Sequence, residues 1–219
     1  MAASANNALT MINLCNISYD PIARIRGNVN TYNPNLQVVW GQVEYTPSGA
    51  YESASLIYIV KGNIVSQSNN DYTVVIRGTN MYSWDSWADE DFDTGVQVGF
   101  NTLVAAAPAN AKIARGTQTG MLYLIRNSRN NMGVSPQDFL KGLGHSVQYL
   151  NVTGHSLGGT LVPPYLTYIC NYLLPEVRLP LNNCQPFSFA GLTPGNAAFN
   201  TYFQRYFPQG LQWRYVNPL

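Results

Sequence analysis

The stretch Asn151–Thr160 reads Asn-Val-Thr-Gly-His-Ser-Leu-Gly-Gly-Thr, and the rest of the chain is organised around it. An apolar run leads into this stretch and predicts a buried strand, while the glycines predict a sharp turn followed by a helix. Glycine on both sides of Ser156 lets strand and helix pass so closely that a side chain there would clash. The pattern predicts a strained turn that exposes the Ser156 hydroxyl at a helix N-terminus, where negative charge is favoured. An ordinary glycine-rich turn is the alternative.

The composition indicates one domain, Met1–Leu219, with few charges. Only 11% of its residues are charged, against roughly 25% in a typical soluble protein. A net charge of +1 argues against a general nucleic-acid-binding function. No apolar run is long enough to span a bilayer. No signal peptide is visible at the N-terminus, which leaves the cytosol, a mature secreted form and export by another route open.

The three cysteines, Cys15, Cys170 and Cys184, have no metal-binding spacing, and the sequence predicts neither a metal nor a cofactor. Cys170 and Cys184 bracket a loop rich in asparagine and proline. A disulfide between them and two buried free thiols are both compatible with that arrangement.

The N-terminal part predicts a helix over Ala8–Tyr19 that covers one face of a sheet and ends at Asp20-Pro21. Leu36–Tyr45, Ala54–Val60 and Asp71–Arg77 are rich in β-branched and aromatic residues and predict strands in antiparallel hairpins. Further elements are expected as follows: a strand at Val96–Phe100, helices within Asn101–Asn131 and Pro136–Leu143, a strand at Pro186–Ala190, a helix at Phe199–Phe207 and a last strand at Leu211–Val216.

A second informative stretch, Val74–Asn80, is an apolar strand that ends in a polar, glycine-containing turn. It is followed by Tyr82–Asp93, which places Trp84 and Trp87 beside five of the eleven acidic residues. An amphipathic surface helix with its tryptophans in the core is the structural interpretation of that segment.

Together these stretches resemble the class 3 (fungal-type) lipase family of the α/β-hydrolase superfamily. The resemblance covers Tyr72–Leu219 well and the N-terminal third weakly. Four segments show the resemblance, in the same order as in the family. Val75–Thr79 is similar to a strand ending in Arg-Gly-Thr, and Val96–Phe100 is similar to Val-His-x-Gly-Phe, with Gln97 in place of histidine. Gly154–Gly159 is similar to the Gly-x-Ser-x-Gly turn, and Phe189–Asn196 is more loosely similar to Phe-Gly-x-Pro-x-x-Gly-Asn.

The resemblance implies an α/β-hydrolase fold with a mostly parallel central sheet and the hydrolysis of carboxylic esters, usually of acyl lipids, without a cofactor. Ser156 takes the position of the nucleophile. The backbone N–H groups of Leu157 and Thr79 take the positions of the oxyanion donors. Tyr82–Asp93 falls where the family has its lid, so Trp84 and Trp87 are expected to cover the Ser156 pocket.

The sequence departs from this family after Ser156, because no histidine and no aspartate follow it. A serine hydroxyl needs an adjacent base to become a nucleophile. Glu176, expected in a loop after a helix, is the only acid downstream. His155 should point away from Ser156 and make a structural hydrogen bond, and His145 lies before the strand, at the far end of the sheet. Neither histidine is expected to act as the base.

Arg214–Leu219 resembles the residues that precede the catalytic aspartate in the family. We therefore expect this chain to be the N-terminal portion of the complete fold, with the acid and the histidine supplied by a second polypeptide, a C-terminal fragment made by cleavage that stays docked. The expected substrate is an acyl ester or lipid, presented at a lipid–water interface. The alternative is a catalytically incomplete lipase-like module that binds an acyl lipid or a protein partner. Acyl transfer is a third possibility.

Pro163 and Pro164 are expected to interrupt and kink the helix after Ser156, because proline lacks the N–H that a helix needs. Arg77 is expected to form a buried ion pair and to have no catalytic role.

Overall fold

The computed structural model describes residues 5–45, 55–66, 69–78, 95–177, 179–208 and 213–215. Its centre is a six-stranded sheet with the order β1-β2-β3-β6-β7-β8. The strands are β1 (Gln37–Tyr45), β2 (Ser55–Lys61), β3 (Asp71–Ile76), β6 (Tyr149–His155), β7 (Cys184–Phe189) and β8 (Trp213–Tyr215). The first three pair as antiparallel hairpins, as predicted, and the pairings from β3 to β8 are parallel. The carboxyl ends of β3, β6, β7 and β8 therefore meet at one edge of the sheet.

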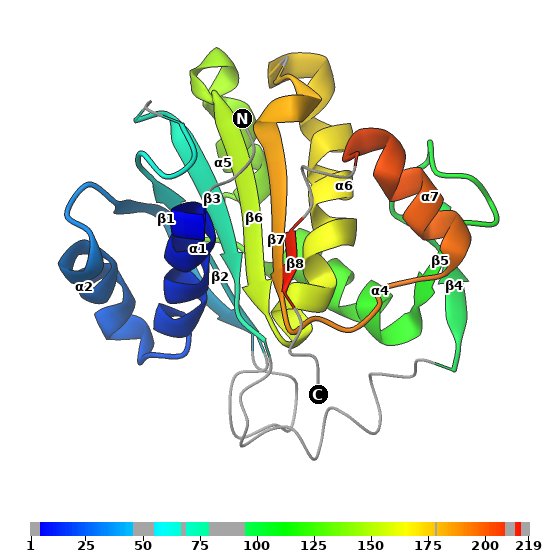
Figure 1. The fold of residues 1–219 in the computed structure, drawn as a ribbon, viewed down its shortest axis with the longest axis horizontal. Helices are drawn as coiled ribbons and strands as arrows, with labels where there is room; N and C mark the ends of the chain where they lie inside the picture. Colours follow the sequence, from blue (N-terminus) through cyan, green and yellow to red (C-terminus); the bar gives the residue numbers. More distant parts are fainter. Residues whose placement is uncertain are drawn as a thin grey trace.

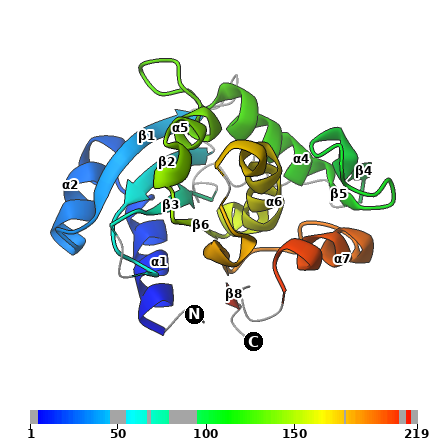
Figure 2. The ribbon, with the colours of Figure 1, turned by 90° about the horizontal axis from the view of Figure 1, so that it is seen from above.

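Helices cover both faces of this sheet (Figures 1 and 2). Figure 2 shows α1 on one side of the sheet and α4, α5 and α6 on the other. The helices are α1 (Ala5–Ile17), α2 (Ile22–Tyr32), α4 (Arg115–Leu122), α5 (Pro136–Gly142), α6 (Leu157–Val177) and α7 (Ala197–Tyr206). This arrangement confirms the predicted α/β fold with a mostly parallel central sheet and the placement of the first helix against a face of the sheet.

The core lies on both faces of the sheet because successive strand residues point to opposite faces. On the α6 face, Val74 and Val152 belong to the larger hydrophobic cluster, which includes Tyr165 of α6. On the α1 face, Val75 packs with Leu14 of α1. Burial on both faces explains why the central strands read as nearly continuous apolar runs in the sequence. No helix in the described part of the chain is long and apolar enough to cross a membrane.

The helix α2 was not expected. Pro21 ends the preceding turn, but it also stands at the N-terminal boundary of the next helix, with φ of −50°. Proline near a helix start costs little, because the N–H groups there have no partner within the helix. Ile25 and Val29, one turn apart, are its buried residues, and the rest of α2 is largely polar. Pro21 therefore ends the first helical segment, as predicted, and also begins the next one.

A two-stranded sheet of β4 (Gln97–Gly99) and β5 (Lys112–Ala114) stands apart from the main sheet. β4 confirms the strand predicted at Val96–Phe100. The helical prediction for Asn101–Asn131 is wrong at β5 and correct for α4. The pairing partners of β5 explain this error: β5 is held by β4 and by a bridge from Ile113 to the distant Gly195.

The helix α6 runs through Pro163 and Pro164, so the predicted interruption is wrong. Pro163 cannot donate to the carbonyl of Gly159, four residues earlier. The hydroxyl of Ser188 on β7 donates to that carbonyl instead, at 2.8 Å. A side chain of the sheet thus replaces a missing helical hydrogen bond. Glu176 lies in the last turn of α6 and not in a loop, which corrects a second prediction.

The C-terminal elements agree with the sequence. The predicted strand at Pro186–Ala190 corresponds to β7, the aromatic helix at Phe199–Phe207 to α7, and the last strand to β8. The residues after Tyr215 lie outside the described part of the chain.

Candidate active site

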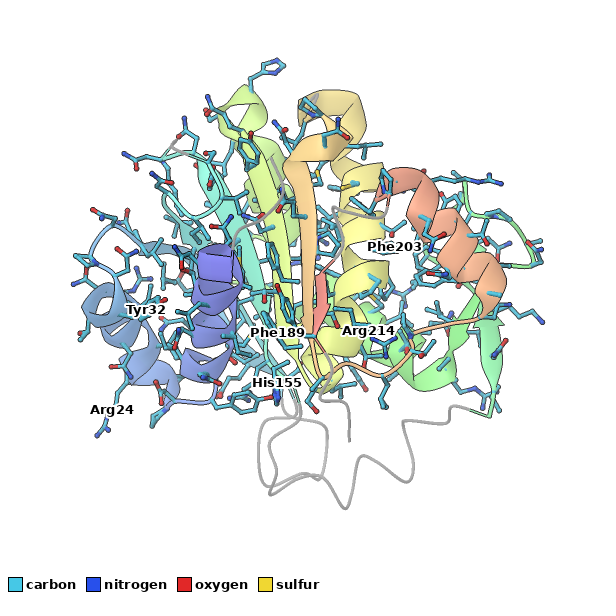
Figure 3. The ribbon with its side chains drawn as sticks, in the orientation of Figure 1. Arg24, Tyr32, His155, Phe189, Phe203 and Arg214 are labelled. Atoms are coloured by element: carbon cyan, nitrogen blue, oxygen red, sulfur yellow. The ribbon has the colours of Figure 1, made fainter. Side chains whose placement is uncertain are left out.

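Ser156 lies between the end of β6 and the start of α6, at the carboxyl edge of the parallel strands. Figure 3 shows its neighbour His155 at that edge, near Phe189 of β7. The backbone of Ser156 has φ of +56°, in the left-handed region that costs an L-residue roughly 1–2 kcal/mol. Its N–H donates to the carbonyl of Phe189 at 2.9 Å, and its carbonyl accepts from Thr160 at 3.1 Å. The predicted strained turn is present.

The glycines around Ser156 are required by close backbone contacts, as predicted. A Cβ on Gly154 would stand 2.4 Å from the carbonyl carbon and oxygen of Gly158. One on Gly158 would stand 2.2 Å from the carbonyl oxygen of Ile76, and one on Gly159 would stand 2.7 Å from that of Phe189. Carbon atoms do not approach carbonyl oxygens this closely. The start of α6 therefore packs directly on β3, β6 and β7 with no side chain between.

Of the two predicted oxyanion donors, the structure describes Leu157 but not Thr79. Leu157 is the first residue of α6, where a backbone N–H has no partner within the helix. Thr79 lies outside the described residues, as do Trp84 and Trp87. Gly78, the residue before Thr79, is buried, and a Cβ there would stand 3.1 Å from the Cβ of Ser156. The end of the β3 segment thus reaches the turn at Ser156.

The ring of His155 packs against Tyr19, which follows α1. Its Nδ1 lies 3.1 Å from the Tyr19 hydroxyl, and the two rings meet edge to face with centroids 5.8 Å apart. Burial lowers the pKa of His155 below its usual value. The predicted structural hydrogen bond of His155 is confirmed. Its partner Tyr19 was not foreseen, because no local pattern links residues 136 positions apart.

His145 lies in a short 3₁₀ turn, Gly144–Ser146, ahead of β6. It is exposed and stands at the end of β6 opposite to Ser156. The seven residues of β6 span about 20 Å. This separation agrees with the expectation that His145 does not reach the serine.

Arg77 forms the predicted ion pair, which is buried at the arginine while the Glu44 side chain is 33% exposed. Its Nη1 lies 3.2 Å from Oε1 of Glu44 on β1, and the Arg77 side chain is 5% exposed. The same Nη1 contacts the carbonyl of Ser18 at 3.5 Å. Arg77 therefore ties β1 and the end of α1 to β3, close to the site.

A cavity of about 340 Å³ opens beside the site, between α6, β7, α7 and β8. Figure 3 labels two of its lining residues, Phe203 and Arg214. Arg214 donates to the carbonyl of Gly191 at 3.0 Å. Ser188 and Leu192 also line this cavity, but Ser156 does not. The cavity therefore lies near Ser156, but the Ser156 side chain does not form part of its wall.

The cysteines are buried free thiols, which decides between the two alternatives left by the sequence. A hydrogen bond to Cys184, together with burial, raises the pKa of Cys170 well above its usual value. Burial raises the pKa of Cys15 to about 12. Such thiols stay protonated and are poor nucleophiles. Within the described ranges, no group of three or more histidine, cysteine, aspartate or glutamate side chains could hold a metal ion.

No family model and no curated protein matches this sequence. Solved structures do match its fold. M37 lipase is 24% identical with a TM-score of 0.76, over 96% of this chain and 67% of that one. A lipase from Rhizopus microsporus var. chinensis is 19% identical with a TM-score of 0.62, over 98% and 67%. A fungal lipase in complex with an inhibitor is 18% identical with a TM-score of 0.67, over 98% and 72%. The chain therefore has a lipase-like α/β-hydrolase fold, and it spans about two thirds of the length of these structures.

Proposed function

We propose that this chain is the nucleophile-bearing part of a carboxylic ester hydrolase that acts on acyl lipids, with Ser156 as the nucleophile. The main support for this proposal is the backbone conformation of Ser156. A non-glycine residue with φ of +56°, enclosed by glycines that no other residue could replace, is a strained feature held in place by its surroundings. Strain of this kind concentrates at functional sites.

The proposed reaction is acyl transfer through the serine. Ser156 Oγ attacks the ester carbonyl carbon as its proton passes to a base, and the carbonyl oxygen becomes an oxyanion. The backbone N–H groups of Leu157 and Thr79 donate to that oxyanion. The intermediate then expels the alcohol, which takes the proton from the base, and water releases the acid from the acyl-enzyme. Each oxyanion donor contributes roughly 10²–10³ to the rate in such sites.

The base and the acid of this proposal come from residues outside Met1–Leu219. The chain has two histidines. One is bonded to Tyr19 through Nδ1, and the other stands at the opposite end of β6. We propose that a second polypeptide, a C-terminal fragment that stays docked, supplies both the aspartate and the histidine. Mass spectrometry of the protein isolated without denaturation tests this: a co-purifying peptide with both residues is expected, and an active species of 24.2 kDa alone would contradict it.

The segment Tyr82–Asp93 is proposed as a lid, on its sequence alone. It combines two large apolar side chains, Trp84 and Trp87, with five acidic residues. Such a segment suits a cover that turns its apolar side towards a lipid surface on opening. The proposed substrate is accordingly an acyl ester at a lipid–water interface.

The decisive experiment uses the full-length protein with a short-chain p-nitrophenyl ester and an alkyl phosphonate probe. Wild-type protein should hydrolyse the ester and carry the phosphonate on Ser156. Ser156→Ala should lose at least roughly 10³ in turnover and all labelling, because the covalent step is gone. Ser146→Ala, an exposed serine at the far end of β6, is the matched control and should behave as wild type. Equal hydrolysis by Ser156→Ala would refute the proposal.

A binding module is the second candidate, and the positions of the two histidines favour it. If no residue activates Ser156, the wild-type protein will neither hydrolyse the ester nor react with the phosphonate. Binding of vesicles that contain acyl lipid, with the same affinity in Ser156→Ala, would then identify the module.

A further inference from the structure

Tyr19 stands where the two segments of the proposed site meet. It follows α1, and its N–H donates to the carbonyl of Asn16 at 3.0 Å, which fixes its backbone in the turn that ends the helix. Its side chain extends towards the carboxyl edge of the sheet, where its hydroxyl lies 3.1 Å from Nδ1 of His155. His155 directly precedes the proposed nucleophile. Tyr19 therefore contacts the nucleophile turn from the α1 face.

The same hydroxyl is close to Gly78, the residue before the proposed oxyanion donor Thr79. A Cβ on Gly78 would stand 2.8 Å from the Tyr19 hydroxyl oxygen and 2.5 Å from the carbonyl oxygen of His155. Gly78 is thus enclosed between Tyr19 and the nucleophile turn, with no room for a side chain. Burial raises the pKa of Tyr19, and a hydrogen bond from the backbone of Gly78 acts in the opposite direction.

We propose that Tyr19 is a positioning residue that holds the oxyanion segment and the nucleophile turn at a fixed distance through one hydroxyl group. The hydroxyl proton is donated to Nδ1 of His155, and the hydroxyl oxygen lies directly against the backbone of Gly78. This arrangement makes His155 the neutral tautomer with its proton on Nε2. In this proposal Tyr19 takes part in no chemical step and acts through Gly78 and His155. The inference rests on the proposed ester hydrolysis at Ser156.

The effect of losing the hydroxyl follows from the way oxyanion donors work. They must lie within a few tenths of an ångström of the developing charge, and a displacement of 1 Å can cost about 10²-fold in rate. Without its link to His155, the Gly78 segment keeps its connection to β3 but gains freedom next to Ser156. A smaller displacement should lower turnover about tenfold and leave the binding of substrate nearly unchanged, because the oxyanion forms only in the transition state.

The test substitutes phenylalanine for Tyr19, which keeps the ring and removes only the hydroxyl. Tyr32→Phe is the matched control. The two tyrosines are similarly exposed, at 37% for Tyr19 and 38% for Tyr32. Each hydroxyl has one side-chain hydrogen-bond partner, which is His155 for Tyr19 and Asn13, at 3.4 Å, for Tyr32. Figure 3 shows Tyr32 on α2, apart from His155. In the full-length protein we expect Tyr19→Phe to lower kcat about tenfold with KM within twofold, while Tyr32→Phe matches wild type.

A second measurement does not depend on activity. Amide hydrogen exchange at Gly78 should become faster in Tyr19→Phe and stay unchanged in Tyr32→Phe, and the ¹⁵N shifts of His155 should lose the signature of a single tautomer. Unchanged exchange, an unchanged kcat, or an equal loss of kcat in both variants would overturn the positioning role. A wild-type protein that does not hydrolyse esters would refute the proposed function itself. An active wild type with a fully active Tyr19→Phe would refute only the role of Tyr19.

Discussion

Replacing Ser156 by glycine should make the protein more stable than replacing it by alanine. Both variants lose the hydroxyl, and they differ only in the Cβ. At φ of +56° that Cβ is strained, and the left-handed conformation costs an L-residue roughly 1–2 kcal/mol. Glycine avoids this cost, but it also gives the unfolded chain more conformational freedom. That freedom lowers the free energy of unfolding by roughly 0.5–1 kcal/mol. The net expectation is that Ser156→Gly exceeds Ser156→Ala by about 0.5–1 kcal/mol in the free energy of unfolding.

Urea unfolding at equilibrium measures this difference directly, and a shift of the melting temperature by about 1–4 °C should accompany it in a chain of this size. A second pair of sites checks the reasoning. Ala190 has φ of +50°, so Ala190→Gly should stabilise. Ala8 lies inside α1 and has no positive φ, so Ala8→Gly should destabilise. The argument from backbone strain is refuted if Ser156→Ala proves at least as stable as Ser156→Gly.

Two further predictions concern the loop after β2 and the pH dependence of stability. The Asp71 carboxylate accepts backbone N–H groups from Ile64, Val65 and Ser66 at 3.2, 2.9 and 2.8 Å, and Asp71→Ala should cost about 3 kcal/mol of unfolding free energy because these donors lose their partner. A loss below 1 kcal/mol in urea unfolding would contradict this. Burial lowers the pKa of His155 in the folded protein below its usual 6.5, so the unfolded chain binds the proton more readily. The contribution of neutral His155 to the free energy of unfolding is therefore complete above pH 6.5. It is lost as the pH falls through the pKa of the folded state. His155→Gln should flatten this part of the stability profile between pH 8 and 5, and an unchanged slope would show that other groups cause it.

The turn at Ser156 was predictable because its signal is local. Gly154, Gly158 and Gly159 surround Ser156 within six positions, and each is required by a backbone contact that any strand–turn–helix of this kind makes. The central strands were predictable for a similar reason, since burial on both faces leaves a continuous apolar run. The ion pair of Arg77 followed from an arginine inside such a run, which needs a partner when it is buried.

The missed elements depend on contacts between distant residues. The three residues of β5 form a strand because β4 pairs with them and because Asn196, which caps α7, accepts the N–H of Lys112 at 3.1 Å. The passage of α6 through Pro163 depends on Ser188, 25 positions later, as a substitute donor. Tyr19 was missed because its partner His155 lies on another element. None of these contacts leaves a pattern in the local sequence.

The strained backbone of Ser156 is held by elements that lie far apart in the chain. Phe189 of β7 accepts its N–H, the carbonyl of Ile76 on β3 leaves no room beside Gly158, and Gly154 of β6 packs on the same turn. Relaxing Ser156 would break these contacts together, so a conformation that costs an isolated residue roughly 1–2 kcal/mol persists. A catalytic base requires no such backbone strain, because a histidine in an ordinary conformation can act once an acid orients its ring and its free nitrogen lies within hydrogen-bonding distance of the hydroxyl. The demanding part of the proposed site is therefore a backbone feature built by β3, β6, β7 and α6. An acid and a base, by contrast, are side chains that a docked polypeptide can deliver without reshaping the turn.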